Sequence, residues 1–301
     1  MNSTTNFVAT LISAPASALD GAALARAASV LQSPGQPLWL DRGIAADIPF
    51  NGPAGNNNRE VAERVRAALQ GLPADVVVQA AEGRRKHLFL ADMDSTMIGQ
   101  ECIDEMADFV GKKKEVAAVT EQAMRGEIEF VPALRARVAL LKGLPDTIAD
   151  EVIASRITLT PGATTAIATM RKHGAYTCLV SGGFTLFTDR ISRMIGFDEA
   201  RSNILDIADG KLTGKVIDPV FGRDTKRATL IELRTKLKLQ NADTMAAGDG
   251  ANDLDMILEA GLGVAYHAKP AVAAAAPARI ERGDLTALLY MQGYARAEFA
   301  A

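Results

Sequence analysis

Three short apolar runs, each closed by polar residues, constrain the fold of this chain more than any other feature. The runs and their closing residues are 87–91 with Asp92 to Thr96, 175–180 with Ser181 to Gly183, and 244–247 with Gly248 to Asp253. Helical periods alternate with such runs, which indicates a parallel sheet with helices on both faces. The carboxyl ends of parallel strands share one sheet edge, where open α/β sheets place their active sites.

The organisation of the chain indicates two domains, for which 301 residues are sufficient. Residues 1–82 are interpreted as a small α+β module and residues 83–301 as the α/β domain. Within the module, the sequence predicts strands at 7–12, 37–40 and 76–78, and helices around 24–31 and 61–69. The polar stretch 51–58 contains Gly and Pro and is predicted to be a loop.

Two insertions interrupt the alternation of strands and helices in residues 83–301. The first, about 100–158, is predicted to be all helical because its apolar residues recur at helical spacing. The second, about 203–221, holds Asp209-Gly210 between two β-like runs, which is typical of a hairpin. We expect neither insertion to belong to the sheet and both to cover its carboxyl edge.

Composition and charge exclude several classes of protein. A net charge of -3 gives no reason to expect a nucleic-acid partner, which normally requires a basic surface. No apolar run approaches the ~18 residues of a membrane span, and the apolar stretch 7–14 lacks the basic residues that precede a signal peptide's apolar core. Cys102 and Cys178 lie too far apart for a disulfide framework, which favours a reducing compartment, the cytoplasm. The basic run 84–86 is expected to be a solvated linker.

Asp92 and Asp94 form the first candidate catalytic pair. Side chains two apart on a strand point the same way, so both carboxylates could face one cleft. Two carboxylates this close are unfavourable unless a cation or a shared proton relieves them. Mg²⁺ would do so, because it prefers oxygen ligands. The alternative is an ordinary surface turn, which the apolar run before Asp92 argues against.

A second acidic cluster closes the third apolar run and consists of Asp249, Asn252, Asp253 and Asp255. Gly248 and Gly250 bracket Asp249, which indicates a tight turn with close backbone approach. Part of this cluster has a plainer interpretation, because Asn252 or Asp253 could simply cap the helix that follows.

Lys226 and Ser181 are the remaining polar candidates. Lys226 lies in the first turn of a predicted helix with Asp224 as N-cap, where an ammonium opposes the helix dipole. Such rule-breaking is expected at functional sites, although a solvated lysine is the alternative. Ser181-Gly182-Gly183 joins a strand to a helix, where backbone N–H groups bind anions readily. An ordinary glycine turn is the alternative there.

The order of these motifs resembles the haloacid dehalogenase superfamily over essentially all of residues 83–301. The motifs are Asp92-x-Asp94-x-Thr96, Ser181, Lys226 and Gly248-Asp249-Gly250-x-Asn252-Asp253. Glu101, Phe130 and Arg137 extend the resemblance to the phosphoserine phosphatase family within it. The resemblance implies a Rossmann-like parallel sheet with a helical cap insertion. Residues 1–82 are similar in pattern to ACT-like regulatory domains, which implies an amino-acid ligand or subunit pairing into a homodimer.

The same resemblance implies a two-step hydrolysis of O-phospho-L-serine to L-serine and phosphate, the reaction that ends serine biosynthesis. Asp92 would be the nucleophile and become an aspartyl phosphate. Asp94 would be the general acid and then the general base. Mg²⁺ would bind Asp92, the backbone carbonyl of Asp94, and Asp249. Ser181, the Gly182 N–H and Lys226 would hold the phosphate oxygens.

The resemblance also implies how the remaining residues act. Asp253 would orient Lys226, and Asn252 would lie near the transferring group. Glu101 would pair with the substrate ammonium and Arg137 with its carboxylate, with Phe130 beside them. Arg137 lies seven residues after Phe130, on almost the same helical face. For Arg137 the alternative is an internal salt bridge or a snorkelling side chain.

Two other functions remain open at this stage. One is a phosphatase or phosphotransferase of the same superfamily that acts on another small phosphomonoester. The other is an amino-acid-sensing regulatory protein whose phosphatase half is vestigial. The intact set Asp92, Asp94, Lys226 and Asp249 argues against the second.

Overall fold

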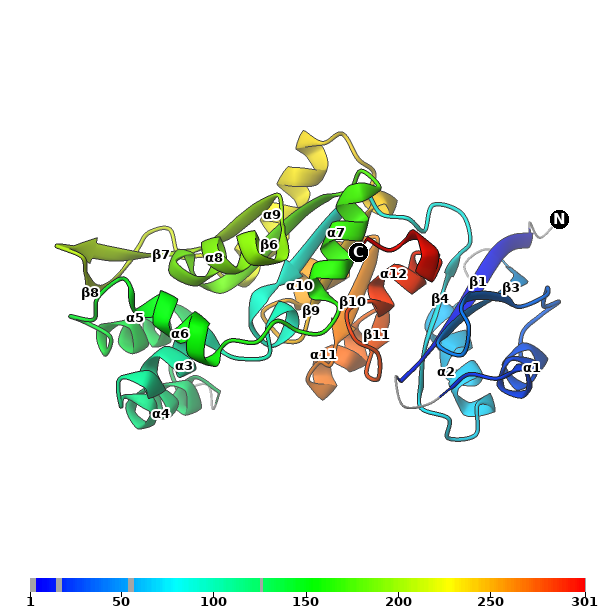
Figure 1. The fold of residues 1–301 in the computed structure, drawn as a ribbon, viewed down its shortest axis with the longest axis horizontal. Helices are drawn as coiled ribbons and strands as arrows, with labels where there is room; N and C mark the ends of the chain where they lie inside the picture. The colour runs from blue at the N-terminus through cyan, green and yellow to red at the C-terminus, as the bar shows by residue number, and fades with distance from the viewer. Residues whose placement is uncertain (1–3, 15–17, 54–56, 125–126, 301) are drawn as a thin grey trace.

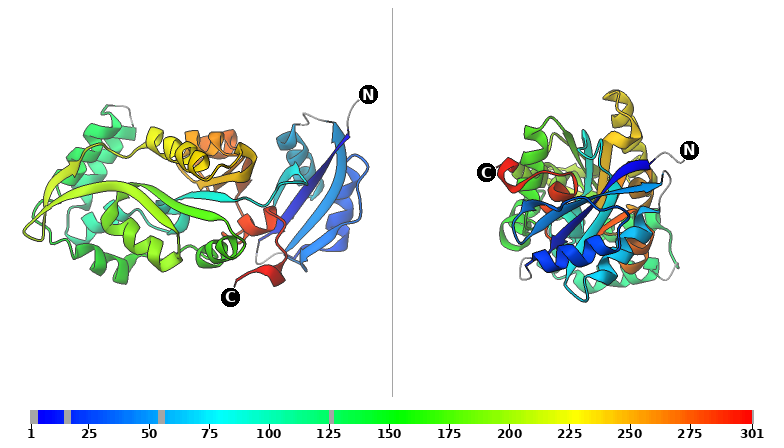
Figure 2. Two further views of the ribbon diagram at one scale, coloured as in Figure 1. Left: turned by 90° about the horizontal axis from the view of Figure 1, so that it is seen from above. Right: turned by 90° about the vertical axis from the view of Figure 1, so that its right-hand side faces the viewer.

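The computed structural model describes residues 4–14, 18–53, 57–124 and 127–300 (Figure 1). The molecule is elongated. The N-terminal module lies at one end, the helical insertion at the other, and the large sheet between them (Figures 1 and 2). Within the described residues, no helix is long and apolar enough to cross a membrane.

The N-terminal module is a four-stranded sheet in the order β2-β3-β1-β4, with two helices. Its elements are β1 (Thr4–Ser13), α1 (Gly21–Ser29), β2 (Leu38–Asp41), β3 (Ala45–Pro53), α2 (Asn58–Ala68) and β4 (Ala74–Ala80). The predicted strands correspond to β1, β2 and β4. The loop prediction for 51–58 is wrong over 51–53, which belong to β3, and at Asn58, which begins α2; residues 54–56 lie outside the described residues. Pro49 weakens the strand pattern of β3, and pairing with β1 overrides that local signal.

The two faces of this small sheet have different partners. One face packs on α1 and α2, in a core that includes Leu11, Val65 and Val76. The other face contributes Ile12 and Val77 to the main core of the α/β domain. Alternation along β1 and β4 sends adjacent residues to opposite faces. The N-terminal module is therefore packed against the α/β domain through an apolar interface.

The α/β domain has a seven-stranded sheet in the order β11-β10-β9-β5-β6-β7-β8. The strands are β5 (Leu88–Asp92), β6 (Tyr176–Phe184), β7 (Glu199–Ala208), β8 (Lys211–Ile217), β9 (Thr244–Gly248), β10 (Leu262–Tyr266) and β11 (Ala278–Ile280). β5 is fully buried and pairs in parallel with both β6 and β9. In this register Asp92 lies opposite Val180, and Ala91 opposite Ala247. The polar ends of the three apolar runs therefore meet, as predicted.

Helices cover both faces of this sheet (Figure 2). The helices are α7 (Ala163–Lys172), α8 (Thr185–Ile195), α9 (Arg223–Lys236), α10 (Leu254–Glu259), α11 (Pro270–Ala275) and α12 (Ala287–Met291). Leu88 and Leu90 of β5 belong to the core formed with α9 and α10. Phe89 and Ala91 belong to the core formed with α7, α8 and α12. The sheet is thus doubly wound, and the predicted fold class is confirmed.

The first insertion is helical and consists of α3 (Cys102–Phe109), α4 (Lys113–Met124), α5 (Phe130–Ala139) and α6 (Ile148–Arg156). The second insertion differs from the prediction, because β7 and β8 are strands of the large sheet. β7 begins at Glu199 and pairs there in parallel with β6 before it continues into the hairpin. Its polar start, 199–202, gave no strand signal. The predicted turn is present, and both Asp209 and Gly210 have positive φ (50° and 69°).

The segment 84–86 is not the solvated linker that its charge suggests. Lys86 is 7% exposed and donates hydrogen bonds to the carbonyls of Gly83 and Ala242. Arg84 forms an ion pair with Asp47 of the N-terminal module. Cys102 and Cys178 are buried and free, as expected for chain positions far apart.

Candidate active site

A cavity of about 150 Å³ opens at the carboxyl ends of β5, β6 and β9. It is lined by Asp92, Asp94, Glu101, Ile103, Phe130, Arg137, Gly182, Gly183, Phe184, Asp249, Gly250, Asn252 and Lys269. Residues of both the large sheet and the helical insertion contribute. The structure thus brings most of the predicted site residues to one cavity, and Ser181, Lys226 and Asp253 lie directly behind its wall.

Asp92, Lys226 and Asp253 form a buried chain of charges behind the cavity. Lys226 Nζ lies 2.6 Å from Asp92 Oδ1 and 2.7 Å from Asp253 Oδ1. The three residues are 4%, 0% and 0% exposed in the order Asp92, Lys226, Asp253. Burial alone lowers the pKa of Lys226, but the two carboxylates outweigh it and the pKa is raised, so the ammonium stays charged. A charged lysine so completely buried requires such partners.

The helix that carries Lys226 begins earlier than predicted. α9 starts at Arg223 with Gly222 as N-cap, so Asp224 lies inside the first turn and is not the cap. The Lys226 N–H donates to the Gly222 carbonyl at 3.0 Å. Its ammonium is therefore fixed at the start of the helix, where anionic partners offset the unfavourable dipole.

Asp253 occupies the N-cap position of α10 but does not act as a side-chain cap. Its Oδ2 accepts from the Gly250 N–H at 3.0 Å, and its Oδ1 from Lys226. A Cβ on Gly248 would lie 2.4 Å from Asp253 Cγ, so only glycine fits there. Asp255 does not belong to the acidic cluster predicted from the sequence, because its carboxylate forms an ion pair with Arg223 at the surface.

Asp94 lies in a tight turn after β5, η1 (Met93–Met97), in which Ser95 has a φ of 55°. Asp94 therefore reaches the cavity through this turn, not through the strand alternation assumed from the sequence. Its carboxylate accepts from the Cys102 N–H at 2.9 Å and from Ser181 Oγ at 3.2 Å. Burial, followed by the nearby Glu101 carboxylate, raises the pKa of Asp94 to about 6. A carboxyl with such a pKa is suited to general acid–base catalysis near neutral pH.

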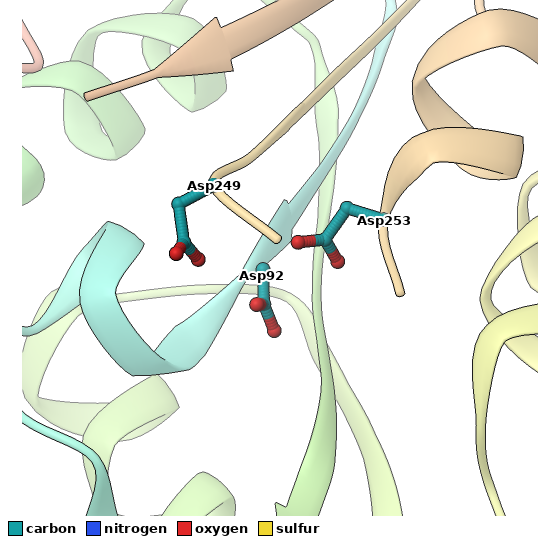
Figure 3. A group of neighbouring side chains, drawn as sticks. All are labelled: Asp92, Asp249 and Asp253. Atoms are coloured by element: carbon teal, nitrogen blue, oxygen red, sulfur yellow. The ribbon is translucent and has the colours of Figure 1, made fainter. Parts of the chain in front are cut away.

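Three carboxylates offer a metal site. Oxygens of Asp92, Asp249 and Asp253 lie within 4.8 Å of one another, and Figure 3 shows their side chains beside the end of β5. Burial and Asp253 raise the pKa of Asp249 to about 6, with a further contribution from Glu101. Burial and Asp253 also raise the pKa of Asp92 well above its usual range. Closely packed oxygen donors of this kind fit a hard divalent cation, which would relieve their repulsion.

Three predicted residues of the helical insertion line the same cavity. Glu101 Oε1 accepts from Ser95 Oγ at 2.8 Å. Phe130 begins α5 and packs over the backbone, since a Cβ on Gly222 would lie 3.1 Å from its Cε1. Each comes from an element outside the large sheet, so the insertion forms the outer wall of the cavity.

Arg137 projects into the cavity with little to hold it. Its Nε donates to the Ala133 carbonyl at 3.4 Å and its guanidinium to Thr120 Oγ1 at 3.5 Å. Burial lowers the pKa of Arg137, against the opposing charges of Asp104 and Glu101. Among the described residues, Arg137 has no ion pair within 4 Å, and the carboxylates of Asp104 and Glu101 act on it only through their charge, which does not support the alternative of an internal salt bridge.

Sequence reasoning missed Lys269 and the hydrogen-bonding role of Ser95. The Lys269 N–H donates to the Asp249 carbonyl at 3.1 Å, and its side chain lines the cavity. Lys269 stands directly before Pro270 at the start of α11, which marks a helix start but gives no sign of a nearby site. Ser95 orients Glu101 only because the turn after β5 folds back toward α3.

Comparisons with known proteins agree with this geometry. A family model described as haloacid dehalogenase-like hydrolase matches residues 89–258. The chain is 49% identical over 207 residues to a protein of Polaromonas sp. (strain JS666) named phosphoserine phosphatase, covering 67% of this chain and 88% of that protein. A crystal structure of a HAD family hydrolase from Salmonella enterica serovar Typhi superposes with a TM-score of 0.83 at 28% identity, covering 95% of this chain and 98% of that one.

A second solved structure is named probable phosphoserine phosphatase, from Vibrio cholerae, in unliganded form. It has a TM-score of 0.75 at 31% identity and covers 98% of this chain and 88% of that one. This chain therefore belongs to the haloacid dehalogenase-like hydrolase family. Within the family it groups with phosphoserine phosphatases, and it is a phosphatase. Members of the family generally use a divalent metal, in agreement with the cluster of Asp92, Asp249 and Asp253.

Proposed function

We propose that this phosphatase hydrolyses O-phospho-L-serine to L-serine and phosphate with Mg²⁺. One observation carries the choice of substrate: Glu101 and Arg137, of opposite charge, line the same small cavity as Asp92 and Asp94. A substrate with an ammonium and a carboxylate on one carbon offers a partner to each. A sugar phosphate offers neither, and burying Glu101 and Arg137 against it would leave both charges unpaired.

Asp92 attacks phosphorus in the first step. The bond between phosphorus and the serine oxygen breaks, a bond to an Asp92 oxygen forms, and Asp94 gives its proton to the leaving oxygen. The raised pKa of Asp94, about 6, keeps a proton available for this transfer. In the second step Asp94 takes a proton from water, whose oxygen displaces Asp92 from phosphorus and releases phosphate.

The negative charge of the phosphoryl oxygens is stabilised by Lys226, Ser181 and the Gly182 N–H. Ser181 Oγ already accepts from the Gly183 N–H at 2.8 Å, which fixes the hydroxyl at the end of β6. Asp92, Asp249 and the backbone carbonyl of Asp94 are the residues that would hold Mg²⁺, and the bound ion would act as a Lewis acid toward the phosphoryl oxygens. Asp253 keeps Lys226 in position, and Asn252 lies at the cavity rim.

The N-terminal module has the element order βαββαβ, which is the order of the ferredoxin-like fold. We propose that it is an ACT-like regulatory module that binds an amino acid and pairs two copies of the chain. The edge strand β2 exposes 60% of Leu38, which supports pairing at that edge. Two free buried cysteines suit a reducing compartment, for which we propose the cytoplasm. Equilibrium dialysis with amino acids and light scattering test the two binding proposals.

The test of the enzymatic proposal is phosphate release from a panel of phosphomonoesters, with Mg²⁺ and with EDTA. The panel contains L-phosphoserine, phosphoethanolamine, sugar phosphates and nucleoside monophosphates. We expect Mg²⁺-dependent turnover with phosphoserine strongly preferred. Mg²⁺-dependent turnover with a sugar phosphate preferred would leave the Asp92 mechanism intact and overturn the substrate.

A further inference from the structure

The helical insertion is connected to the sheet by two segments that pair with each other. The outgoing segment is 97–100 and the return segment 157–161; together we call them the stem. The Gly99 N–H donates to the Thr158 carbonyl at 3.0 Å, and the Thr160 N–H to the Met97 carbonyl at 3.0 Å. The Gln100 side chain accepts from the Thr158 N–H through Oε1 and donates to Thr158 Oγ1 through Nε2, both at 2.9 Å. Glu101 follows directly on the stem, so movement of the stem moves this residue.

The base of the stem rests on the chain between β11 and α12. The Leu285 N–H donates to the Pro161 carbonyl at 3.0 Å. Gly162 has a φ of 81°, and a Cβ there would lie 2.7 Å from the Thr286 backbone nitrogen. Asp284 Oδ1 accepts from the Thr286 N–H at 2.8 Å and holds this turn in shape. The base of the stem therefore follows the position of residues 284–286 closely.

Asp75 of the N-terminal module anchors the three residues before that turn. It lies in β4, is 1% exposed, and accepts from the N–H groups of Glu281 at 2.8 Å, Arg282 at 3.1 Å and Gly283 at 2.8 Å. Figure 1 shows β4 beside β11 and α12. Burial raises the pKa of Asp75, whereas the three N–H bonds favour its charged form. Hydrogen bonds to a carboxylate are among the stronger ones in proteins.

We propose that Asp75 is a positioning residue for substrate capture, acting through residues 281–286 and the stem on Glu101 and the rest of the insertion. The N-terminal module thereby helps to set where the outer wall of the cavity stands over Asp92 and Asp94. The choice of substrate in this inference rests on the proposed function, but the mechanical link does not. A cavity lined by Ser95, Thr158 and Arg282 among others separates the rest of the stem from residues 282–284, so the direct contacts between the two are at Pro161 and Gly162.

The test compares two variants of the full chain, Asp75→Asn and Asp47→Asn. Asn at 75 keeps one acceptor oxygen but turns an N–H toward a backbone N–H of residues 281–283. Asp47 is the matched control: it is 2% exposed, lies in the same sheet, and binds Thr10 and Arg84 but not residues 281–286. For Asp75→Asn we expect amide hydrogen exchange about 10-fold faster at 281–286 and at 157–162, the effect of losing about one hydrogen bond.

Steady-state kinetics with two substrates distinguish an effect on the position of Glu101 from a general loss of stability. We expect Asp75→Asn to raise KM for phosphoserine about 5-fold to 10-fold, with kcat little changed. The KM for p-nitrophenyl phosphate, which has neither ammonium nor carboxylate, should change less than about 2-fold because it does not depend on Glu101 or Arg137. Asp47→Asn should leave both exchange at 157–162 and the ratio of the two KM values unchanged.

Two outcomes would overturn the proposal. One is faster exchange at 281–286 with unchanged exchange at 157–162 and unchanged KM. The other is an equal loss on both substrates in both variants. If Asp75→Asn does not fold, Asp284→Ala replaces it, because this substitution removes the acceptor of the Thr286 N–H in the same connection. We expect it to raise KM for phosphoserine more than KM for p-nitrophenyl phosphate, and the same two outcomes would overturn the proposal. If the wild-type chain does not hydrolyse phosphoserine, the proposed function fails, and hydrogen exchange alone decides the mechanical link.

Discussion

The two walls of the cavity are built in different ways. The inner wall holds Asp92 and Asp94, with Ser181, Lys226 and Asp253 directly behind it. Asp92, Lys226 and Asp253 are almost fully buried, and Lys226 has hydrogen bonds of 2.6 and 2.7 Å. The outer wall, formed by Glu101, Phe130 and Arg137, is carried by the insertion. Phe130 in this wall is 43% exposed, and the hydrogen bonds of Arg137 are 3.4 and 3.5 Å.

The two walls differ because the inner wall serves the chemical steps and the outer wall serves substrate recognition. Groups that must stabilise charge during bond breaking gain from being fixed before the substrate arrives. Groups that recognise a charged substrate must let it in and let the products out. A loosely held outer wall over a rigid inner wall meets both needs.

Replacing the nucleophile of the inner wall should have the largest effect on activity. We expect Asp92→Asn to lower kcat by about 10⁴-fold or more, because no other group can form the phosphoenzyme. Rapid-quench trapping with labelled substrate should find no acyl phosphate. Circular dichroism is the control for folding, and retained hydrolysis in a folded variant would remove Asp92 as nucleophile.

Breaking the buried charge chain should affect stability as well as rate. Lys226→Gln leaves Asp92 and Asp253 buried without their cation, and we expect a loss of about 3 kcal/mol in the free energy of unfolding. Urea denaturation in EDTA measures it. The matched control is Arg227→Gln, one residue further on, whose exposed ion pair with Glu259 should contribute less than about 1 kcal/mol. Equal effects of the two substitutions would contradict the distinction between buried and exposed pairs.

A change in the outer wall should affect recognition alone. We expect Arg137→Ala to lower kcat/KM for phosphoserine about 30-fold, the value of a hydrogen bond between charged groups. Phosphoethanolamine, which lacks the carboxylate, should lose less than about 3-fold. Arg135→Ala is the control, since Arg135 pairs with Asp218 outside the cavity. Similar losses on both substrates would show that Arg137 does not bind the carboxylate.

The last prediction concerns stability alone and is a pH dependence of the free energy of unfolding in EDTA. Because the pKa of Asp94 is raised from 3.8 to about 6 in the folded protein, the folded state holds this proton to higher pH than the unfolded state. Stability from this group is therefore full below pH 4 and is lost as the pH rises through about 6. Asp94→Asn removes the titrating group and should be more stable than wild type by up to about 3 kcal/mol at pH 8, the free energy of a shift of about two pKa units.

Urea denaturation of wild type and Asp94→Asn at pH 4 and pH 8 measures this difference. We expect the advantage of the variant to shrink toward zero at pH 4, where Asp94 is protonated in both states. An advantage that is the same at both pH values would show that titration of Asp94 does not underlie it.

Much of the inner wall was predictable because its signals are local. Asp92, Ser181 and Asp249 each follow an apolar run, and strand pairing then brings the run ends together. Lys226 was marked by an unfavourable helix position, although the helix start itself was misplaced. The catalytic and binding roles of these residues remain proposals.

Other features could not be found locally, because the contacts that define them join distant parts of the chain. The start of β7 and the whole of β3 have weak strand patterns, and only pairing with β6 and β1 makes them strands. Lys86 looked like a solvated cation, yet it is buried between the carbonyls of Gly83 and Ala242.

The sequence by itself determined the doubly wound sheet and the identity of the groups at its carboxyl edge, since both follow from short-range periodicity and from the residues that end each strand. Only the tertiary structure decided that Asp75 anchors residues 281–283, more than 200 positions away, and that Lys269 joins the cavity. A hydrogen bond between distant residues depends on how whole elements pack, and no local pattern records it.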